Sequence, residues 1–129
     1  MVLDASAALE LLLNTPAGVR IAGRIADPRE TLHAPHLLDV EVAQVLRRQE
    51  ATGTLRPERG RTALQDLGDL DLQRYPHDVL LPRIWQLRRN VTAYDAAYLA
   101  LAEALDAPLL TCDARLGRAP GHRARVEVV

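Results

Sequence analysis

The sequence predicts an α/β protein, a three-layer α/β/α sandwich with a central parallel sheet. Short apolar runs typical of buried strands alternate with longer segments in which apolar residues recur at helical spacing. Parallel strands need helical crossovers, and most of the predicted strands are separated by segments long enough for one or two helices. The length of 129 residues suits one domain, and the chain contains no internal repeat, low-complexity segment or linker. We therefore expect a single domain over residues 1–129.

The first half of the chain predicts two strands, each followed by two helices. Pro16 suits the first position of a helix, Asp27-Pro28 ends that helix, and Gly53 ends a later one. The expected elements, in order, are a strand over Met1–Leu3, helices over Ala5–Leu13 and Pro16–Ala26, a strand over Thr31–Ala34, and helices over Leu37–Ala51 and Pro57–Asp69.

The second half predicts three strands and two helices. Tyr75-Pro76 ends a weak strand, and Pro120-Gly121 forms a turn before the last strand. The expected elements are a strand over Leu70–Arg74, helices over Val79–Arg89 and Thr92–Leu105, and strands over Pro108–Thr111 and Val126–Val129. No helix is predicted between the last two strands.

The basic residues are all arginine: the chain has 16 of them and no lysine. This excludes a phosphate-binding loop with its lysine, a Schiff-base enzyme, and phosphoryl-aspartate proteins whose pattern includes a lysine. The formal net charge of −1 gives no overall basic field for binding nucleic acid, so such binding requires local charge.

The cysteine content and the N-terminus indicate a cytoplasmic protein. Cys112 is the only cysteine, so no internal disulfide forms, and the N-terminus shows no secretory pattern. The apolar runs are far shorter than the roughly 18 residues that span a bilayer. We expect no membrane segment.

Two acidic residues follow predicted strands directly. Asp4 comes immediately after the first strand, and Asp113 lies two residues beyond the strand that ends at Thr111. In open parallel sheets, functional sites lie at the carboxyl ends of the strands, where the crossover direction switches. Each aspartate is alternatively a simple helix cap.

Two more acids lie on helices beside apolar residues. Glu41 is at the margin of an apolar helical stripe, and Asp95 shares a helix face with Tyr98. Thr92-x-x-Asp95 is alternatively a capping box, whereas Glu103 is expected to point into solvent. Helices that follow parallel strands begin where the strands end, so all four acids are expected at one edge of the sheet.

Four carboxylates at one edge repel each other, and a divalent cation removes that repulsion. Hard oxygen ligands without histidine or cysteine favour Mg²⁺ or Mn²⁺ over Zn²⁺. His33 and His36 flank Pro35 without a third ligand, so they do not indicate a zinc site. We therefore expect Mg²⁺ or Mn²⁺ to be held by Asp4, Asp95, Glu41 and Asp113.

Four segments, taken in order, make up a recognisable pattern that extends over essentially the whole chain. They are Val2-Leu3-Asp4-Ala5-Ser6-Ala7, Asp39-Val40-Glu41-Val42 leading to Leu46-Arg47-Arg48, Thr92-Ala93-Tyr94-Asp95-Ala96-Ala97-Tyr98-Leu99-Ala100-Leu101-Ala102, and Leu110-Thr111-Cys112-Asp113-Ala114-Arg115-Leu116. In these segments the chain resembles the PIN-domain ribonucleases and, more narrowly, the VapC toxins of bacterial toxin–antitoxin pairs.

The resemblance implies a PIN-like parallel-sheet fold and a Mg²⁺-dependent endoribonuclease site. It also implies pairing as a homodimer, a VapB-like antitoxin as inhibitor, and RNA substrates such as tRNA or rRNA. The site residues it implies are Asp4, Glu41, Asp95 and Asp113. Some relatives carry a further acid just after the last aspartate, where this chain has Arg115, which puts a fully ligated second metal ion in doubt.

A divalent ion suits phosphodiester hydrolysis, because it lowers the pKa of a bound water and neutralises developing charge. With water rather than a ribose 2′-hydroxyl as nucleophile, the expected products carry 5′-phosphate and 3′-hydroxyl ends. Ser6 and Thr111 are expected to hydrogen-bond the metal-binding carboxylates Asp4 and Asp113, although helix capping and strand packing explain them equally.

The stretch from Ala114 to Val126 supplies local positive charge. It contains four arginines and no acid, so it carries +4 while the rest of the chain sums to −5. Arginine binds phosphate through paired hydrogen bonds, which favours contact with the RNA backbone. The alternative is a solvated loop or a rim that binds the antitoxin. The candidate phosphate contacts are Arg115, Arg118, Arg123 and Arg125.

Two other functions stay open from sequence. One is a PIN-like RNA-binding or scaffold domain without turnover. The other is a small partner-binding module whose acids are all helix caps. The amphipathic segment from Arg56 to Leu70 suits either a homodimer face or an antitoxin groove.

Overall fold

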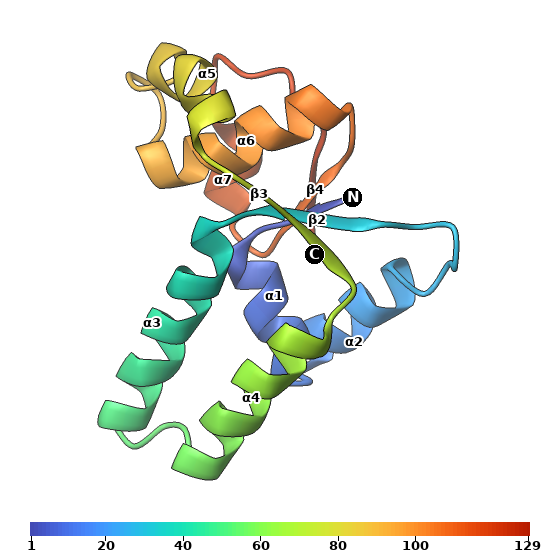
Figure 1. The fold of residues 1–129 in the computed structure, drawn as a ribbon, viewed down its shortest axis with the longest axis vertical. Helices are drawn as coiled ribbons and strands as arrows, with labels where there is room; N and C mark the ends of the chain where they lie inside the picture. The colour runs from blue at the N-terminus through green and yellow to red at the C-terminus, as the bar shows by residue number, and fades with distance from the viewer.

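Five parallel strands form one sheet in the order β3-β2-β1-β4-β5 in the computed structural model, which describes all residues 1–129 (Figure 1). The elements are β1 (Val2–Leu3), α1 (Ala5–Leu12), α2 (Pro16–Arg24), β2 (Leu32–Pro35), α3 (Leu37–Ala51), α4 (Pro57–Asp69), β3 (Leu72–Tyr75), the 3₁₀ turn η1 (Asp78–Leu80), α5 (Leu81–Gln86), α6 (Ala93–Leu105), β4 (Leu109–Thr111), α7 (Ala114–Arg118) and β5 (Val126–Val128).

Helices cover both sides of this sheet. In Figure 1, α5 and α6 lie on one side and α1 to α4 on the other, with α3 and α4 extending away from the sheet as an antiparallel pair. This arrangement confirms the predicted three-layer sandwich with a parallel sheet. No helix is long and apolar enough to cross a lipid bilayer.

The central strands are buried on both faces, as a parallel sheet covered by helices requires. Val2 and Leu109 contribute to the larger hydrophobic cluster, while the following residues, Leu3 and Leu110, pack into a smaller cluster with Ile21 of α2. The alternation follows from the two-residue period of a strand. Because β1 lies in the middle of the sheet, the residue that follows it is held between well-packed neighbours.

Helix α7 was not predicted, and it connects the last two strands. Asp113 caps it by accepting a hydrogen bond from the backbone N–H of Arg115 at 2.9 Å. At five residues the helix is too short to show an apolar period, so the sequence pattern does not reveal it. The helix provides the crossover that lets β5 run parallel to β4.

Most other elements differ from the prediction by one or two residues at an end, and two of these differences have a structural reason. The helix predicted over Val79–Arg89 is divided into η1 and α5, with Pro82 in the first turn of α5. Strand β3 begins at Leu72 rather than Leu70, because the Leu70 N–H still bonds to the carbonyl of Asp66 at the end of α4.

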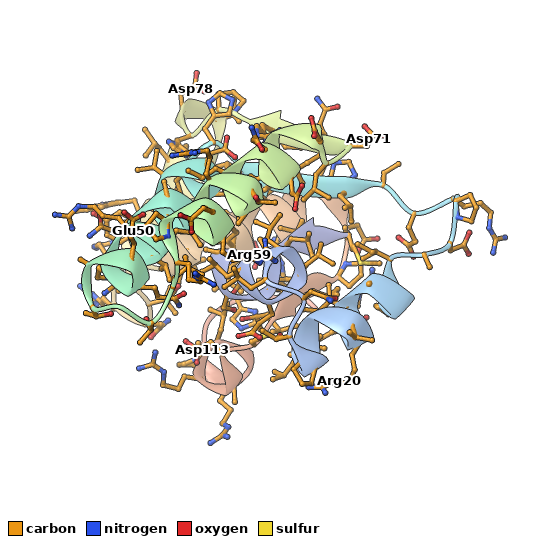
Figure 2. All side chains as sticks on the ribbon, turned by 90° about the horizontal axis from the view of Figure 1, so that it is seen from below. Arg20, Glu50, Arg59, Asp71, Asp78 and Asp113 are labelled. Atoms are coloured by element: carbon orange, nitrogen blue, oxygen red, sulfur yellow. The ribbon has the colours of Figure 1, made fainter.

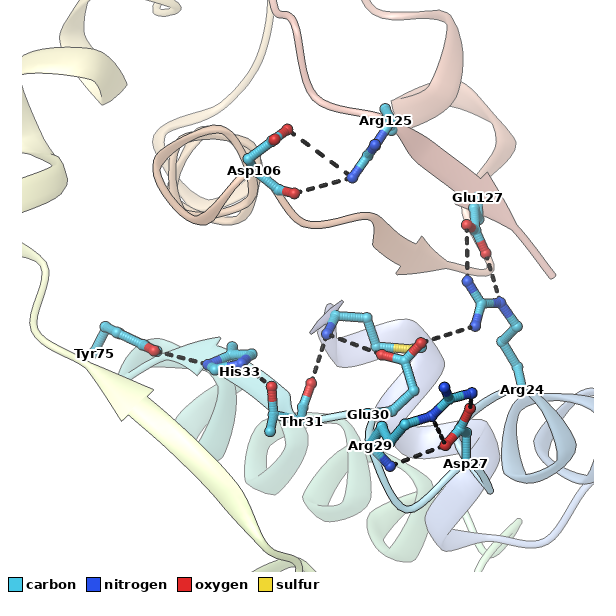
Figure 3. Close-up of polar contacts among 11 residues, drawn as sticks. Arg24, Asp27, Arg29, Glu30, Thr31, His33, Tyr75, Asp106, Arg125 and Glu127 are labelled. Atoms are coloured by element: carbon cyan, nitrogen blue, oxygen red, sulfur yellow. Dashed lines mark hydrogen bonds and ion pairs between the residues drawn. The ribbon is translucent and has the colours of Figure 1, made fainter.

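A polar network holds the amino ends of the central strands (Figure 3). The amino group of Met1 donates to the carbonyl of Thr31 at 2.5 Å and lies 3.8 Å from Glu30. Arg24 of α2 pairs with Glu30 and also with Glu127 of β5, at 3.1 Å. Through these contacts, α2 is connected to Glu30, just before β2, and to Glu127 of β5, which lie on different sides of β1 in the sheet.

Candidate active site

The strand order places a topological switch point between β1 and β4. The chain proceeds outward from β1 through β2 to β3, and then returns to add β4 on the other side of β1. Ligand sites in open α/β sheets lie at the carboxyl ends of such strands. The residues at this point are Asp4, directly after β1, and the segment from Thr111 to Asp113 after β4.

Asp4 is the most buried of the four candidate acids, with 7% of its surface exposed. Its Oδ1 accepts hydrogen bonds from the Ser6 hydroxyl at 2.7 Å and from the Ala7 N–H at 2.9 Å, so it also caps α1. Its Oδ2 accepts from the Thr111 hydroxyl at 2.5 Å. Capping and membership of the acidic site are therefore compatible in this residue.

The hydroxyls of Ser6 and Thr111 join the end of β1 to the end of β4. Besides donating to Asp4, Ser6 Oγ accepts from the Cys112 N–H at 2.9 Å. Thr111 Oγ1 likewise accepts from the Asp113 N–H at 2.9 Å. Each hydroxyl thus donates to the Asp4 carboxylate and accepts from the backbone just after β4, which fixes the orientation of the Asp4 oxygens.

Glu41 of α3 is half-buried and has a partner that the sequence analysis assigned only to the core. Tyr98 of α6 is 2% exposed and donates its hydroxyl to Glu41 Oε1 at 2.6 Å. Burial and this hydrogen bond raise the pKa of Tyr98, so it stays protonated as a donor. The sequence signal that could have identified Tyr98 is its hydroxyl group, which lies on the apolar face of α6 about one turn after Asp95.

Asp95 lies in the first turn of α6 and is half-buried. Its backbone N–H donates to Thr92 Oγ1 at 3.1 Å, so Thr92 is the residue that caps this helix. The negative charges of Asp113 and Asp4 contribute to raising the pKa of Asp95, after the larger effect of burial.

The four acids form one electrostatic cluster. Burial raises the pKa values of Asp4, Glu41 and Asp95, and neighbouring negative charges raise them further. Asp113 acts on both Asp4 and Asp95, while Glu41 is affected by Asp95 and Asp4. Segments from four parts of the chain therefore bring like charges together.

Asp113 differs from the other three because it has an internal counter-ion. Arg115 donates to Asp113 Oδ1 from Nε at 3.1 Å and to Oδ2 from its terminal nitrogen at 3.0 Å. These hydrogen bonds are the main cause of the lowered pKa of Asp113. In Figure 2, Asp113 lies at the start of α7, on the opposite side of the view from Asp71 and Asp78.

No three of the acidic, histidine or cysteine side chains are arranged as they stand to hold a metal ion. The chemistry of the donor set nevertheless fits a hard divalent cation. It consists of carboxylates whose negative charges oppose each other's ionisation, and oxygen ligands are those that Mg²⁺ and Mn²⁺ prefer.

Two cavities flank the acids. One of about 750 Å³ is lined by Asp95 and Asp113 together with Arg115 and Arg118. The other, of about 700 Å³, is mostly apolar and includes Ser6 and Glu41 in its lining. The acidic cluster therefore separates a charged cavity from an apolar one.

Arg123 and Arg125 are not brought to the acids. The Arg123 backbone N–H donates to Glu103 Oε1 at 2.7 Å. Arg125 donates to the carbonyl of Asp106 at 3.0 Å, as Figure 3 shows. Both contacts lie at the carboxyl-terminal end of α6, whereas Asp95 is at its amino-terminal end.

Glu103 does not point into solvent, so that prediction was wrong. Its side chain is 6% exposed and accepts hydrogen bonds from Arg83 at 2.7 and 3.0 Å. Helix α5 and the loop at Arg123 pack over this part of α6, which the local helical pattern does not reveal. The charge pair satisfies the buried carboxylate.

Comparison with known proteins agrees with this arrangement. The PIN domain family model matches residues 1–121. The fold and the acidic site at its switch point define a PIN-domain protein, and the chain belongs to that family.

Similarity at full length narrows the assignment. The chain is 43% identical over 129 residues to ribonuclease VapC12 of Mycobacterium tuberculosis, covering 100% of this chain and 98% of that protein. It is 44% identical over 130 residues to ribonuclease VapC1 of the same organism, covering 99% and 96%. The structure of VapBC2 from Rickettsia felis, bound to a DNA fragment from their promoter, shares the fold with a TM-score of 0.74 at 13% identity, covering 99% and 97%. Within the PIN-domain family, this chain is of the VapC type.

Proposed function

We propose that this protein is a metal-dependent endoribonuclease and the toxin of a type II toxin–antitoxin pair. The observation that carries the proposal is the cluster of Asp4, Glu41, Asp95 and Asp113 at the switch point of a VapC-type PIN domain. Metal dependence is a general property of PIN-domain VapC ribonucleases. The two mycobacterial relatives are named as ribonucleases, which supports RNA as the substrate.

The metal we propose is Mg²⁺ or Mn²⁺, held by the four acids of the cluster. When bound, such an ion lowers the pKa of water and neutralises charge on the phosphate. The protein's part is to place the carboxylate oxygens. Thr111 and Ser6 orient Asp4, and Tyr98 orients Glu41, through the hydrogen bonds described above.

Hydrolysis adds the hydroxide of water to phosphorus and breaks the bond to the 3′ oxygen, which takes up the proton. The products then have 5′-phosphate and 3′-hydroxyl ends. We assign the contacts with phosphate oxygens to Arg115 and Arg118, and their position in the lining of the charged cavity supports this. Arg123 and Arg125, also predicted as phosphate contacts, would reach only RNA that extends past the far end of α6.

We further propose a VapB-like antitoxin as partner, tRNA or rRNA as substrate, the cytoplasm as location and a homodimer as the working form. The Rickettsia felis structure is of a VapBC pair, which supports the antitoxin. Helix α4 is amphipathic, and its exposed Leu64 lies on a surface available to a second copy or to an antitoxin.

The test is cleavage of structured RNA by purified protein with Mg²⁺ or with EDTA. Asp4→Asn and Asp95→Asn should abolish cleavage while circular dichroism shows an intact fold. Asp71→Asn is the matched control, because this exposed acid lies on the opposite side of the molecule from Asp113 (Figure 2). The result that supports the proposal is metal-dependent cleavage by wild type and by Asp71→Asn, with no cleavage by Asp4→Asn or Asp95→Asn.

Two results would redirect the interpretation. RNA binding without turnover in either metal indicates a PIN-like RNA-binding or scaffold domain. A protein that neither binds Mn²⁺ nor gains thermal stability from it is better explained as a partner-binding module whose acids cap helices.

A further inference from the structure

The charged cavity beside Asp95 and Asp113 extends to a second group of arginines. Besides Arg115 and Arg118, its lining includes Arg88 and Arg89, which lie in the turn between α5 and α6. Sequence analysis did not single out this pair. Four arginines and two aspartates thus share one cavity of about 750 Å³, and positive charge predominates away from the acids.

The arginines of this turn have no acidic partner. No carboxylate lies within 4.0 Å of Arg88, Arg89 or Arg118, although seven other arginines of the chain form ion pairs. An arginine paired with a carboxylate has its donors occupied. These three keep most of theirs for a ligand, and the planar guanidinium group matches the oxygens of a phosphate.

Arg88 is also held in place before any ligand binds. Its guanidinium carbon lies 4.7 Å from the centroid of the Trp85 ring, and its terminal nitrogen donates to the Trp85 carbonyl at 2.8 Å. Stacking on tryptophan restrains a side chain that otherwise loses rotamer freedom on binding. Arg88 lines the cavity while it keeps these contacts with Trp85.

The cavity also contains the start of α6. Thr92, its N-cap, and Asn90 lie in the lining between the arginine pair and Asp95. The amino-terminal end of a helix of 13 residues carries partial positive charge, which adds to the field of the arginines. The path from the turn to the acidic cluster is therefore continuous and lined with groups that favour anions.

We propose that Arg88 and Arg89, together with Arg118 of α7 in the same cavity, form a binding site for the RNA backbone phosphates next to the cleaved one. The inference rests on the proposed nuclease function and adds the path of the RNA. The RNA strand runs from the acidic cluster across the start of α6 onto the turn after α5. The contacts are with phosphate, so they do not depend on base sequence.

The test measures binding apart from cleavage. A fluorescein-labelled oligouridylate of roughly 12 nucleotides is titrated with protein in EDTA, and anisotropy is followed over a series of salt concentrations. In Arg88→Gln/Arg89→Gln we expect affinity to fall by roughly tenfold and the slope of log K against log salt to lose about 1 to 2 units. The matched control is Arg47→Gln/Arg61→Gln, which removes two exposed, unpaired arginines from α3 and α4.

A second readout uses the only tryptophan. Because Arg88 stacks on Trp85, oligouridylate binding at this site should change Trp85 emission in wild type and in the control, and should change it little in Arg88→Gln. This measurement does not depend on the labelled end of the RNA.

Two results would overturn the inference. They are unchanged affinity and salt slope in the Arg88/Arg89 variant, or an equal loss of affinity in the Arg47/Arg61 control. Failure of the nuclease function shows differently: Arg88- and Arg89-dependent binding would persist while wild type cleaves no RNA in Mg²⁺.

Discussion

Arg115 holds both carboxylate oxygens of Asp113, at 3.1 and 3.0 Å, two residues along the chain. The contact gives Asp113 a positive partner that Asp4, Glu41 and Asp95 lack. A divalent cation bound by all four acids must compete with this arginine for Asp113. When a cation displaces Arg115 from Asp113, the guanidinium donors of Arg115 become available to a phosphate of the RNA in the charged cavity that this residue lines.

Arg115→Gln should therefore strengthen metal binding. An exposed ion pair is weak, so we expect Mn²⁺ affinity to rise only roughly two- to fivefold. Titration followed by electron paramagnetic resonance of free Mn²⁺ measures this change. Arg118→Gln is the control, because it removes the same charge from the same cavity without freeing a carboxylate. Equal effects of the two substitutions would indicate general electrostatics rather than competition.

Tyr98→Phe should weaken the site through Glu41. The Tyr98 hydroxyl lowers the pKa of Glu41, so its removal raises that pKa further and leaves the carboxylate free to rotate. We expect cleavage to fall by about 10- to 100-fold and stability to fall by about 1 kcal/mol. Cleavage should recover partly at higher pH, where Glu41 is again ionised. A loss of activity that is equal at all pH values would contradict the positioning role.

Asp95→Asn should stabilise the metal-free protein at neutral pH. The raised pKa values of Asp4, Glu41 and Asp95 mean that the folded state holds protons more tightly than the unfolded state. Their contribution to stability is therefore favourable at low pH and is lost as pH rises through these pKa values. Removing one charge relieves the repulsion, and we expect Tm at pH 7 to rise by about 1 to 4 °C.

The same variant should respond less to metal. Mn²⁺ should raise the Tm of wild type, since it binds only the folded state, and should raise that of Asp95→Asn much less. Differential scanning calorimetry with Mn²⁺ and with EDTA measures both effects. A metal-free Asp95→Asn protein that melts below wild type at pH 7 would show that the favourable position of this carboxylate in the first turn of α6 outweighs the charge repulsion.

Glu103→Ala should affect stability without affecting chemistry. It leaves the half-buried Arg83 without its carboxylate and the Arg123 N–H without its acceptor, so we expect a loss of about 2 to 3 kcal/mol. Arg83 lowers the pKa of Glu103, so this stabilisation is present at neutral pH and is lost as pH falls through that lowered pKa. Urea unfolding at pH 7 and at acidic pH measures the change. Cleavage per folded molecule should equal wild type.

The fold was largely predictable because its elements carry local signals. Strands of apolar residues, Pro16 at a helix start and Gly53 after a helix end are read directly from neighbouring residues. Helix α7 was missed because five residues make little more than one turn, and its formation depends on the Asp113 cap and on packing against β5.

The site was only partly predictable. Asp4 and Asp113 were found because ligand sites in open parallel sheets lie at the carboxyl ends of the strands, and both residues follow a strand. Tyr98 was missed because its ring belongs to the core, and nothing in the sequence shows that its hydroxyl reaches Glu41. Arg88 and Arg89 were missed because nothing in the sequence shows that the turn after α5 faces the same cavity as Asp113, Arg115 and Arg118.

The order of helices and strands and the four acids, with the motifs around them, can be read from short segments, and the resemblance to the PIN-domain nucleases rested on those motifs. Which charges meet depends on packing between distant segments. The run of arginines after Asp113 is divided by the turn at Gly121, so that Arg115 and Arg118 stay beside the acids while Arg123 and Arg125 reach the other end of α6. Charge composition describes a segment, but the direction of the backbone decides which partner each charge reaches.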